Sequence, residues 1–301
     1  MSKNIEAKAG NLTDLNYKLD LQNFGVDKIY VITDFENTAR KEAFIEAWSN
    51  FKGFEYTFHP AIMGKNLSIP NLLLQKKISK YFYDTHPTLT HNIYGVALSH
   101  REIYKIARKS KFERILILED DARPSSFFYD YIMEGKFLKM IHDIKNLSYY
   151  IYFIGLPFDI NAGRYLNGVS IEMKPFQQFA AHAYVVHYHA LKWLIDYTEQ
   201  IDVAADVVLQ GPWNDRPMLA CQHSIIQQQG ILLKKWTSED ESDPDFIFRS
   251  QTQPRYNERD QENYPPNINI SKSVLKHVDS IEEKMHYDQV MYEVKLKSNL
   301  I

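Results

Sequence analysis

Four consecutive aliphatic residues, Ile115 to Leu118, run directly into three carboxylates, Glu119, Asp120 and Asp121. A continuous apolar run, rather than an alternating one, is typical of a strand that is buried on both faces of a sheet. At the end of such a strand, three adjacent negative charges would repel one another strongly without a compensating cation. The pattern therefore predicts a buried strand of an α/β fold, with a metal site where that strand ends.

The chemistry of this predicted site depends on its ligand type and its place in the fold. In open α/β sheets, ligands bind outside the carboxyl ends of the strands, which is where the three acids fall. Oxygen ligands alone favour a hard ion such as Mn²⁺ or Mg²⁺ over zinc. The competing interpretation is a solvated acidic turn, in which one aspartate caps the helix that follows. Spacing alone indicates a metal site and does not name a reaction.

Further apolar runs alternate with helical patterns along the chain. The expected strands are 29–32, 54–58, 150–154 and 183–186, and the expected helices run from about 43 to 51, from about 94 to 109 and through 191–195. Asn37 or Thr38 could cap the first of these helices. The alternation is typical of an α/β domain with a mostly parallel central sheet flanked by helices.

The amino-acid composition of the sequence changes after Trp236. Residues 237–245 are acidic, and the stretch that follows is rich in Gln, Asn, Arg and Pro with little periodicity, before a possible short helix from Ser271. We therefore expect an N-terminal arm over 1–23, a main α/β domain over 24–236, and a C-terminal arm or extension over 237–301.

Composition limits the class of partner. The formal net charge of -3 provides no global basic field for nucleic acid, so any anionic ligand must be held locally. Cys221 is the only cysteine, which excludes an intramolecular disulfide and a cysteine-based zinc site. No apolar stretch resembles a signal peptide or a membrane-spanning helix. We expect a cytoplasmic protein, with contact to a membrane surface left open.

Two segments gain meaning when they are considered together. The first is the pattern Gly-x-Ala-x-Ser-His at Gly95 to His100, and the second, roughly fifteen residues later, is the strand that ends in Glu-Asp-Asp. This pair resembles glycosyltransferase family 25, which includes lipooligosaccharide and procollagen galactosyltransferases. Looser matches at 29–40, 61–65, 181–186 and 206–209 extend the resemblance over about residues 27 to 230.

The resemblance implies a GT-A fold, whose α/β sheet binds a nucleoside-diphosphate sugar and whose acidic motif holds Mn²⁺ or Mg²⁺ against the diphosphate. It implies an inverting transfer of a hexose, with galactose as the first candidate, from a UDP-sugar to a hydroxyl. The acceptor would be a glycan, a lipid-linked saccharide such as lipooligosaccharide, or a protein. Asp121, the last acid, is the expected metal ligand, while Glu119 and Asp120 would hold the donor or orient their neighbour.

An inverting transfer benefits from a base near the acceptor hydroxyl. Asp206 is the first candidate, because it matches the acidic position of a later segment of the family. Asp202 and Asp215 are close in sequence and stay open as alternatives. A helix cap or a surface position is the competing interpretation of Asp206.

Other residues are expected on the donor side. Ser99 and His100 are predicted at a helix start, where free backbone N–H groups favour an anion. The alternative for His100 is packing against the carboxylate strand, with its ring hydrogen-bonded to backbone. Thr33 and Arg40 are expected near the nucleotide, although Thr33-Asp34 departs from the Asn-Leu that usually ends the family's first strand.

The acceptor side is less defined. His182 and Trp213 are candidates for it, and a structural role for His182 is equally open. Two competing functions differ in sequence signature. A nucleotidyltransferase usually has a glycine-rich loop after the first strand, and 33–39 contains no glycine; a GT-A-like binding protein without turnover would have a broken acidic motif, and this one is intact.

Overall fold

A mixed eight-stranded sheet forms the centre of the molecule. The computed structural model describes residues 19–85, 90–156, 164–173, 181–209 and 217–228. The strand order is β4 (Tyr56–Pro60), β2 (Lys28–Thr33), β5 (Arg114–Glu119), β10 (Ala183–His187), β7 (Ile151–Phe153), β11 (Met218–Cys221), β9 (Ser170–Met173) and β8 (Arg164–Tyr165). Strands β4, β2 and β5 are parallel neighbours, and β11 is parallel to β7. The other neighbouring pairs are antiparallel. The α/β fold class is confirmed, and the carboxylates follow a strand of the parallel block.

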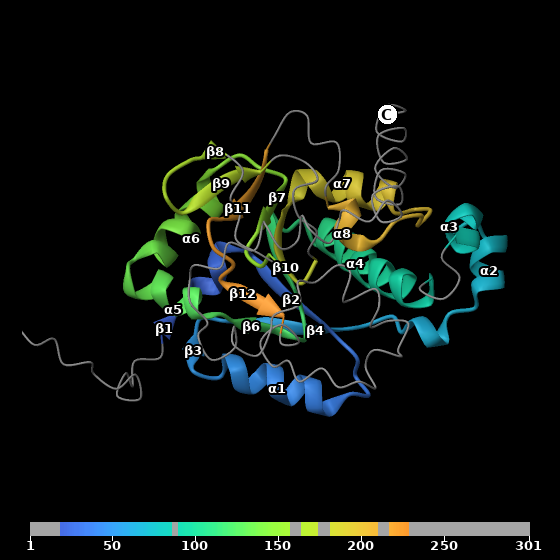
Figure 1. Cartoon of the computed structure of the whole chain (residues 1–301), viewed down its shortest axis with the longest axis horizontal. Helices are drawn as coiled ribbons and strands as arrows, with labels where there is room; N and C mark the ends of the chain where they lie inside the picture. The colour runs from blue at the N-terminus through green and yellow to red at the C-terminus, as the bar shows by residue number, and fades with distance from the viewer. Residues whose placement is uncertain (1–18, 86–89, 157–163, 174–180, 210–216, 229–301) are drawn as a thin grey trace, which may run out of the picture.

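Side chains alternate between the two faces of the sheet, which explains the unbroken aliphatic run. Leu116 and Leu118 share one core cluster with residues of α1 (Thr38–Trp48), α5 (Ser126–Met133) and α6 (Lys136–Asn146). Ile115 and Ile117 belong to a second core cluster, with residues of α4 (Thr90–Ser110), α7 (Tyr188–Tyr197) and α8 (Ala205–Val208). Figure 1 shows α1 on one side of the sheet and α4 and α7 on the other. Burying each such side chain stabilises the fold by roughly 1.5–3 kcal/mol.

The elements expected from apolar patterns are present. The four predicted strands correspond to β2, β4, β7 and β10, and the three predicted helices correspond to α1, α4 and α7. Asn37 is the N-cap of α1, since its side-chain oxygen accepts a hydrogen bond from the backbone N–H of Arg40 at 3.2 Å. The spacing of apolar residues in the sequence was therefore sufficient to predict these strands and helices.

An aromatic cluster fixes α1 against the segment that follows the acids. Trp48 stacks on Phe54 with ring centroids 4.5 Å apart, and its indole Nε1 donates a hydrogen bond to the carbonyl of Ala122 at 3.1 Å. Ala122 begins β6 (Ala122–Pro124), which pairs antiparallel with β12 (Ile226–Gln228). The turn that carries the carboxylates is thus held at both ends, by β5 before it and by β6 after it.

Residues before the first long strand also belong to the packed fold. The short strand β1 (Leu19–Asp20) pairs with β3 (Phe51–Lys52), and Leu21 and Phe24, on either side of the start of η2 (Gln22–Gly25), are fully buried. Residues 19–23, which we assigned to the N-terminal arm, therefore pack against the domain. The predicted extension 237–301, with its helix from Ser271, lies outside the described residues.

The connection from β4 to α4 is made of short helices. It contains η3 (Gly64–Asn66), α2 (Ile69–Leu74) and α3 (Lys80–Thr85), and Figure 1 shows α2 and α3 at one extremity of the fold. Within the described ranges, no helix has both the length and the apolar character that crossing a membrane requires.

Candidate active site

The three carboxylates lie where two parallel strands end side by side. Ile32 of β2 pairs with Glu119 of β5, so Thr33, the last residue of β2, lies beside the turn that Asp120 and Asp121 form. The carboxyl ends of parallel strands are where α/β folds bind ligands. The predicted location of the acids, at the exit of a buried strand, is confirmed.

Both carboxylate oxygens of Asp120 contact protein groups. Its Oδ1 lies 2.5 Å from Nη2 of Arg40, and its Oδ2 accepts a hydrogen bond from the hydroxyl of Thr33 at 2.8 Å. The backbone carbonyl of Asp120 accepts a further hydrogen bond from Arg123 at 2.8 Å. Burial raises the pKa of this carboxyl, while Arg40 and Thr33 counteract part of the effect. Asp120 therefore holds Arg40 in place beside the acidic turn.

Asp121 differs because one of its oxygens is unused. Its Oδ2 lies 3.3 Å from Nη2 of Arg40, whereas its buried Oδ1 has no hydrogen-bond partner among the described residues. Burial, together with the negative charges of Glu119 and Asp120, raises the pKa of Asp121 to about 7, although Arg40 opposes the shift. A buried oxygen without a partner is costly. A cation bound at this oxygen would remove that cost.

Glu119 faces the opposite side of the sheet. Its Oε1 lies 3.5 Å from Nε2 of His100, and its backbone N–H donates to the carbonyl of His182 at 3.0 Å. Burial alone would raise the pKa of Glu119, but the contact with His100 and the charge of Arg40 outweigh burial and lower it. Glu119 is therefore ionised at neutral pH.

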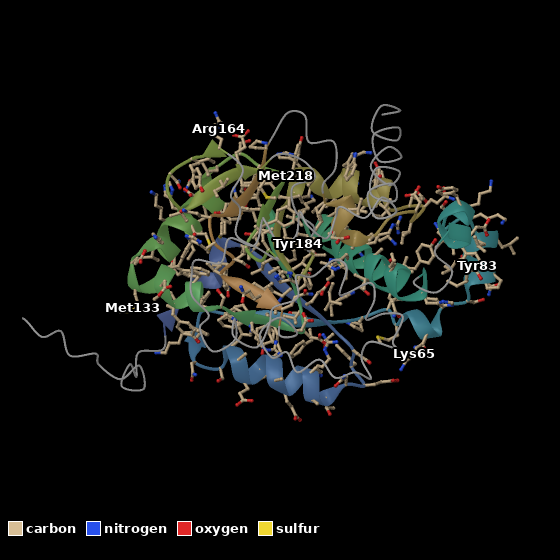
Figure 2. All side chains as sticks on the ribbon, viewed as in Figure 1. Lys65, Tyr83, Met133, Arg164, Tyr184 and Met218 are labelled. Carbon is tan, nitrogen blue, oxygen red and sulfur yellow. The ribbon has the colours of Figure 1, made fainter. Side chains whose placement is uncertain are left out.

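A buried chain of hydroxyls continues from His100 into the core. His100 Nδ1 lies 2.6 Å from the hydroxyl of Tyr184, which lies 2.7 Å from the hydroxyl of Tyr104. Tyr184 is on β10 at the centre of the fold (Figure 2). Burial raises the pKa of the Tyr184 phenol far above its ordinary value, so the tyrosine stays neutral. These hydroxyl groups fix the orientation of the His100 ring, and the ring in turn fixes the position of the Glu119 carboxylate.

The predicted helix start at Ser99 and His100 is wrong. Helix α4 begins at Thr90, so both residues lie in mid-helix, where their backbone N–H groups bond within the helix and cannot receive an anion. The Ser99 hydroxyl instead donates to the carbonyl of Gly95 at 2.7 Å and accepts from the backbone N–H of Ile62 at 2.8 Å. Ser99 and His100 belong to the motif because their side chains pack and form hydrogen bonds, not because they begin a helix.

Gly95 allows the loop after β4 to lie against α4. A Cβ at this position would collide with the carbonyl oxygen of Ile62 and would lie 2.9 Å from the backbone nitrogen of Gly64. The close approach is what brings the N–H of Ile62 within reach of Ser99. The Gly-x-Ala-x-Ser-His motif thus couples this loop, the helix and Glu119 into one unit.

His182 occupies a buried position behind Glu119. Its Nε2 lies 3.2 Å from the carbonyl of Ile226 in β12 and must carry the proton, since a carbonyl only accepts. Burial lowers the pKa of His182, so the ring is neutral. Gly155 lies so close to this ring that a Cβ there would overlap it. These contacts give His182 a supporting position, and an acceptor-side role stays a prediction. Trp213 and Asp215 lie outside the described residues.

Asp206 lies in the first turn of α8, whose N-cap is Ala204. Its Oδ1 accepts a hydrogen bond from the backbone N–H of Val207 at 2.9 Å. Burial raises the pKa of Asp206 to about 6, backbone hydrogen bonds oppose this, and the charge of Glu119 adds to it. The half-buried carboxyl senses the charges of Glu119 and His100, and it is not the N-cap of its helix, which is one of the two competing interpretations.

The residues present fit a divalent ion shared with a ligand, rather than a closed protein cage. Among the residues that the structure describes, no three His, Cys, Asp or Glu side chains are grouped closely enough to hold an ion by themselves. Mg²⁺ and similar ions at phosphate sites usually bind one or two carboxylates, with phosphate oxygens and water completing the shell. Asp121 alone offers a buried, unpartnered carboxylate oxygen in this turn.

Sequence reasoning missed three residues that shape the site. Arg123 donates to the carbonyls of Asp120 and Ala122, and its charge two positions after the acids was an available signal. Tyr184 gave no such signal, because it meets His100 from a distant point in the chain. Tyr104 lies one turn after His100 on α4 and joins the group only through the hydroxyl of Tyr184.

The α/β sheet, with an acidic turn where its parallel strands end, is consistent with a glycosyltransferase fold. The family model described as glycosyltransferase family 25 (LPS biosynthesis protein) matches residues 26–209 of the 301-residue chain. The chain belongs to glycosyltransferase family 25, as the motif at Gly95 to His100 and the acidic motif had indicated. No curated protein matches the chain.

Proposed function

We propose that this glycosyltransferase moves a hexose, galactose as the first candidate, from a UDP-sugar to a hydroxyl with inversion, and that it depends on Mn²⁺ or Mg²⁺. The observation that carries the proposal is the buried Oδ1 of Asp121, without a partner among the described residues, next to the guanidinium of Arg40. A bound divalent ion would stabilise the negative charge that develops on the departing diphosphate. Asp121 would hold this ion.

Arg40 has a second role in the proposal. Its side chain is 48% exposed although it is anchored by Asp120, so it can face solvent and a bound diphosphate from a fixed position. A guanidinium offers several N–H donors in a planar fork that suits phosphate oxygens. Thr33 fixes Asp120 and thereby Arg40. Glu119 would position the donor, from the ionised state that His100 supports.

Asp206 would act as the base. As the acceptor oxygen bonds to the anomeric carbon, the bond from that carbon to the diphosphate oxygen breaks, and the hydroxyl proton passes to Asp206. A pKa of about 6 leaves this carboxylate ionised at neutral pH and makes it a stronger base than an exposed aspartate.

The family description, which refers to LPS biosynthesis, supports a proposal about the acceptor class. It favours a glycan or a lipid-linked saccharide over a protein hydroxyl as the acceptor. A cytoplasmic location remains a prediction.

The test is a comparison of Asp121→Asn with Asp130→Asn, which alters an exposed aspartate on α5. UDP binding would be measured by calorimetry with and without Mn²⁺, and UDP release from a panel of UDP-sugars would be measured by a coupled assay. We expect Asp121→Asn to lower metal-dependent turnover by on the order of a thousandfold, while Asp130→Asn leaves it unchanged.

Two results would contradict the proposal. If Mn²⁺ promotes neither UDP binding nor UDP release by the parent protein, the metal-dependent transferase loses its support. If Asp121→Asn retains full activity, the site lies elsewhere. Binding of UDP-sugars without any turnover would favour the sugar-nucleotide-binding alternative.

A further inference from the structure

The connection between β4 and α4 combines positive charge with apolar side chains. Residues 61–85 contain four lysines and one aspartate, in a chain whose formal net charge is -3. The lysines are Lys65, Lys76, Lys77 and Lys80, and the acid is Asp84. Glu36 lies beside Lys65, Glu199 beside Lys77 and Asp84 beside Lys80, so Lys76 is the lysine of this segment that makes no ion pair among the described residues. An exposed cation of this kind suits an anionic partner.

This segment also presents the most exposed large apolar side chain of the described residues. Leu74, the last residue of α2, is 83% exposed, and Tyr81 on α3 is partly exposed. Ile69, at the other end of α2, is buried in a core cluster that Leu72 and Leu73 also contact. The helix is therefore anchored to the domain by its other residues and directs Leu74 into solvent.

The turn after α2 positions a lysine beside Leu74. The N–H of Lys76 donates to the carbonyl of Leu73 at 3.0 Å, and that of Lys77 donates to Leu72 at 2.8 Å, which is a Schellman C-cap. This cap needs a left-handed residue, usually glycine, but here Lys76 adopts a φ of 54°. Helix α5 ends in the same kind of turn with Gly135 at the left-handed position. At the end of α2, the chain carries a cation where glycine would be less strained.

The lysines of this turn are available to an external anion. Lys76 makes no ion pair among the described residues, and Lys77 and Lys80 make only exposed pairs, with Glu199 and Asp84. Exposed pairs of this kind contribute little stability and exchange readily. Figure 2 labels Lys65 and Tyr83 at this end of the molecule, with Met133 at the opposite end.

We propose that the α2–α3 segment, residues 69–85, is the contact by which this protein docks on an anionic lipid surface. Leu74 and Tyr81 enter the boundary of the acyl chains, and Lys76, Lys77 and Lys80 lie among the headgroups. The combination of exposed apolar and cationic groups fits a lipid surface better than a purely polar anion, which would have no use for Leu74.

The location of the segment gives this docking a purpose. Strand β4 ends at Pro60, which pairs with Thr33 beside Asp120, and η3 and α2 follow from that end of the sheet. The connection that carries the docking surface thus begins at the end of the sheet where the carboxylates lie. The suggested role of this docking rests on the proposed function, because a lipid-linked saccharide acceptor would be presented at such a surface. The binding itself is independent of catalysis.

The test is cosedimentation of the full chain with vesicles of phosphatidylcholine alone and with added phosphatidylglycerol. We expect binding to the anionic vesicles only. Leu74→Gln should weaken this binding by about tenfold or more, and Lys76→Gly by about fivefold, because the second change removes a charge while it suits the left-handed turn. The matched control is Met133→Gln, which alters an equally placed final helical residue that is 71% exposed, and it should bind like the parent.

Several outcomes would overturn the inference. It fails if the parent binds neither vesicle, or if Leu74→Gln and Met133→Gln bind alike. It also fails if sedimentation velocity without lipid shows a dimer that Leu74→Gln dissociates, since the occupant is then a second copy of the chain. UDP release without vesicles, measured on the same preparations, keeps the two proposals apart: lost turnover with intact vesicle binding counts only against the proposed function.

Discussion

Asp120 and Glu119 are neighbours in sequence, yet an ion pair with a half-exposed arginine holds the first and buried polar side chains hold the second. Asp120 points to the face of the sheet that α1 covers, where a charged and half-exposed residue, Arg40, anchors it. Glu119 points to the face that α4 covers, where His100 and a buried chain of tyrosine hydroxyls anchor it. The alternation of side chains along β5 produces this division. One flank of the site is held by exposed charge, and the other by buried hydrogen bonds.

The difference suggests a division of labour between the flanks. Arg40 is charged and exposed to solvent, so its guanidinium can leave Asp121 and bind a phosphate of the ligand at a small cost in free energy. A buried network cannot, because any unpaired member would lose a hydrogen bond without access to water. We therefore expect changes on the Arg40 flank to affect activity more than stability, and changes on the His100 flank to do the reverse.

Among changes on the two flanks, the largest effect is expected for Arg40→Gln. This change removes the cation next to Asp120 and Asp121, and we expect kcat/KM to fall by about a hundredfold, since charge-assisted contacts are the stronger ones. Stability should fall by only about 1 kcal/mol, because the side chain is half exposed. Steady-state kinetics and urea unfolding measure the two quantities.

Lys41→Gln is the control, one residue further along α1. Its ammonium lies over the rings of Phe35 and Phe58 rather than beside the carboxylates. If both variants lose the same activity, Arg40 contributes only general positive charge and the comparison of the flanks does not hold.

The next effect concerns the buried flank. Gly95→Ala places a methyl group against the carbonyl of Ile62, so the loop after β4 must move away from α4. We expect a loss of about 2 kcal/mol in the free energy of unfolding, as is typical of overpacking. Urea unfolding provides the measurement, with Val96→Ala, at the exposed neighbouring position, as a control that should cost less than about 0.5 kcal/mol. An equal cost for both variants would show that the tight contact is unimportant.

The two flanks also differ in how far sequence could predict them. The strand at Ile115 to Leu118 and the acids after it were accessible, because each produces a local pattern of hydrophobicity or charge. Arg40, on the helix that follows β2, was suggested only by the resemblance to the family. Ser99 and His100 were recognised as a motif but were given the wrong physical reason, since helix periodicity does not mark where α4 begins.

The contacts of the buried flank were beyond sequence reasoning. Tyr184 approaches His100 only after β10 pairs with β5 and α4 packs on the sheet, and a tyrosine in an apolar strand looks like any core residue. Tyr104 is on the same helix as His100, but its hydroxyl meets Tyr184 only in the folded protein. The pairing of β6 with β12, which holds the end of the acidic turn, joins short segments about a hundred residues apart. Neither segment had a recognisable strand pattern. Long-range pairing of short strands leaves no local signal.

The pH dependence of activity should separate Asp206 from Asp121. With Asp206 as the base, the ionised form is active, so kcat/KM should fall about tenfold per pH unit below pH 6 and level off above it. Because burial raises this pKa, the same carboxyl lowers folding stability as the pH rises from about 4 to 6, where the unfolded chain has already released its proton.

A titration of Mn²⁺ distinguishes the two carboxyls. A metal competes with the proton on its ligand, so a limb of the profile due to Asp121 should move to lower pH as Mn²⁺ is increased, whereas a limb due to Asp206 should stay in place. Asp206→Asn should abolish the fixed limb. A profile with no fixed limb near pH 6 would exclude Asp206 as the base.

The smallest effect is expected for Tyr184→Phe, which removes only the hydroxyl between His100 and Tyr104. Both partners lose a buried hydrogen bond, so the free energy of unfolding should fall by about 1 kcal/mol. Activity should fall no more than about threefold, because Glu119 keeps its contacts with His100 and with the backbone of His182 and loses only some of its rigidity. The control is Tyr30→Phe, which alters a buried tyrosine on β2 that does not belong to this series of hydrogen-bonded hydroxyls. An activity loss as large as that of Arg40→Gln would mean that the buried flank takes a direct part in binding the donor, and the division between the two flanks would then be wrong.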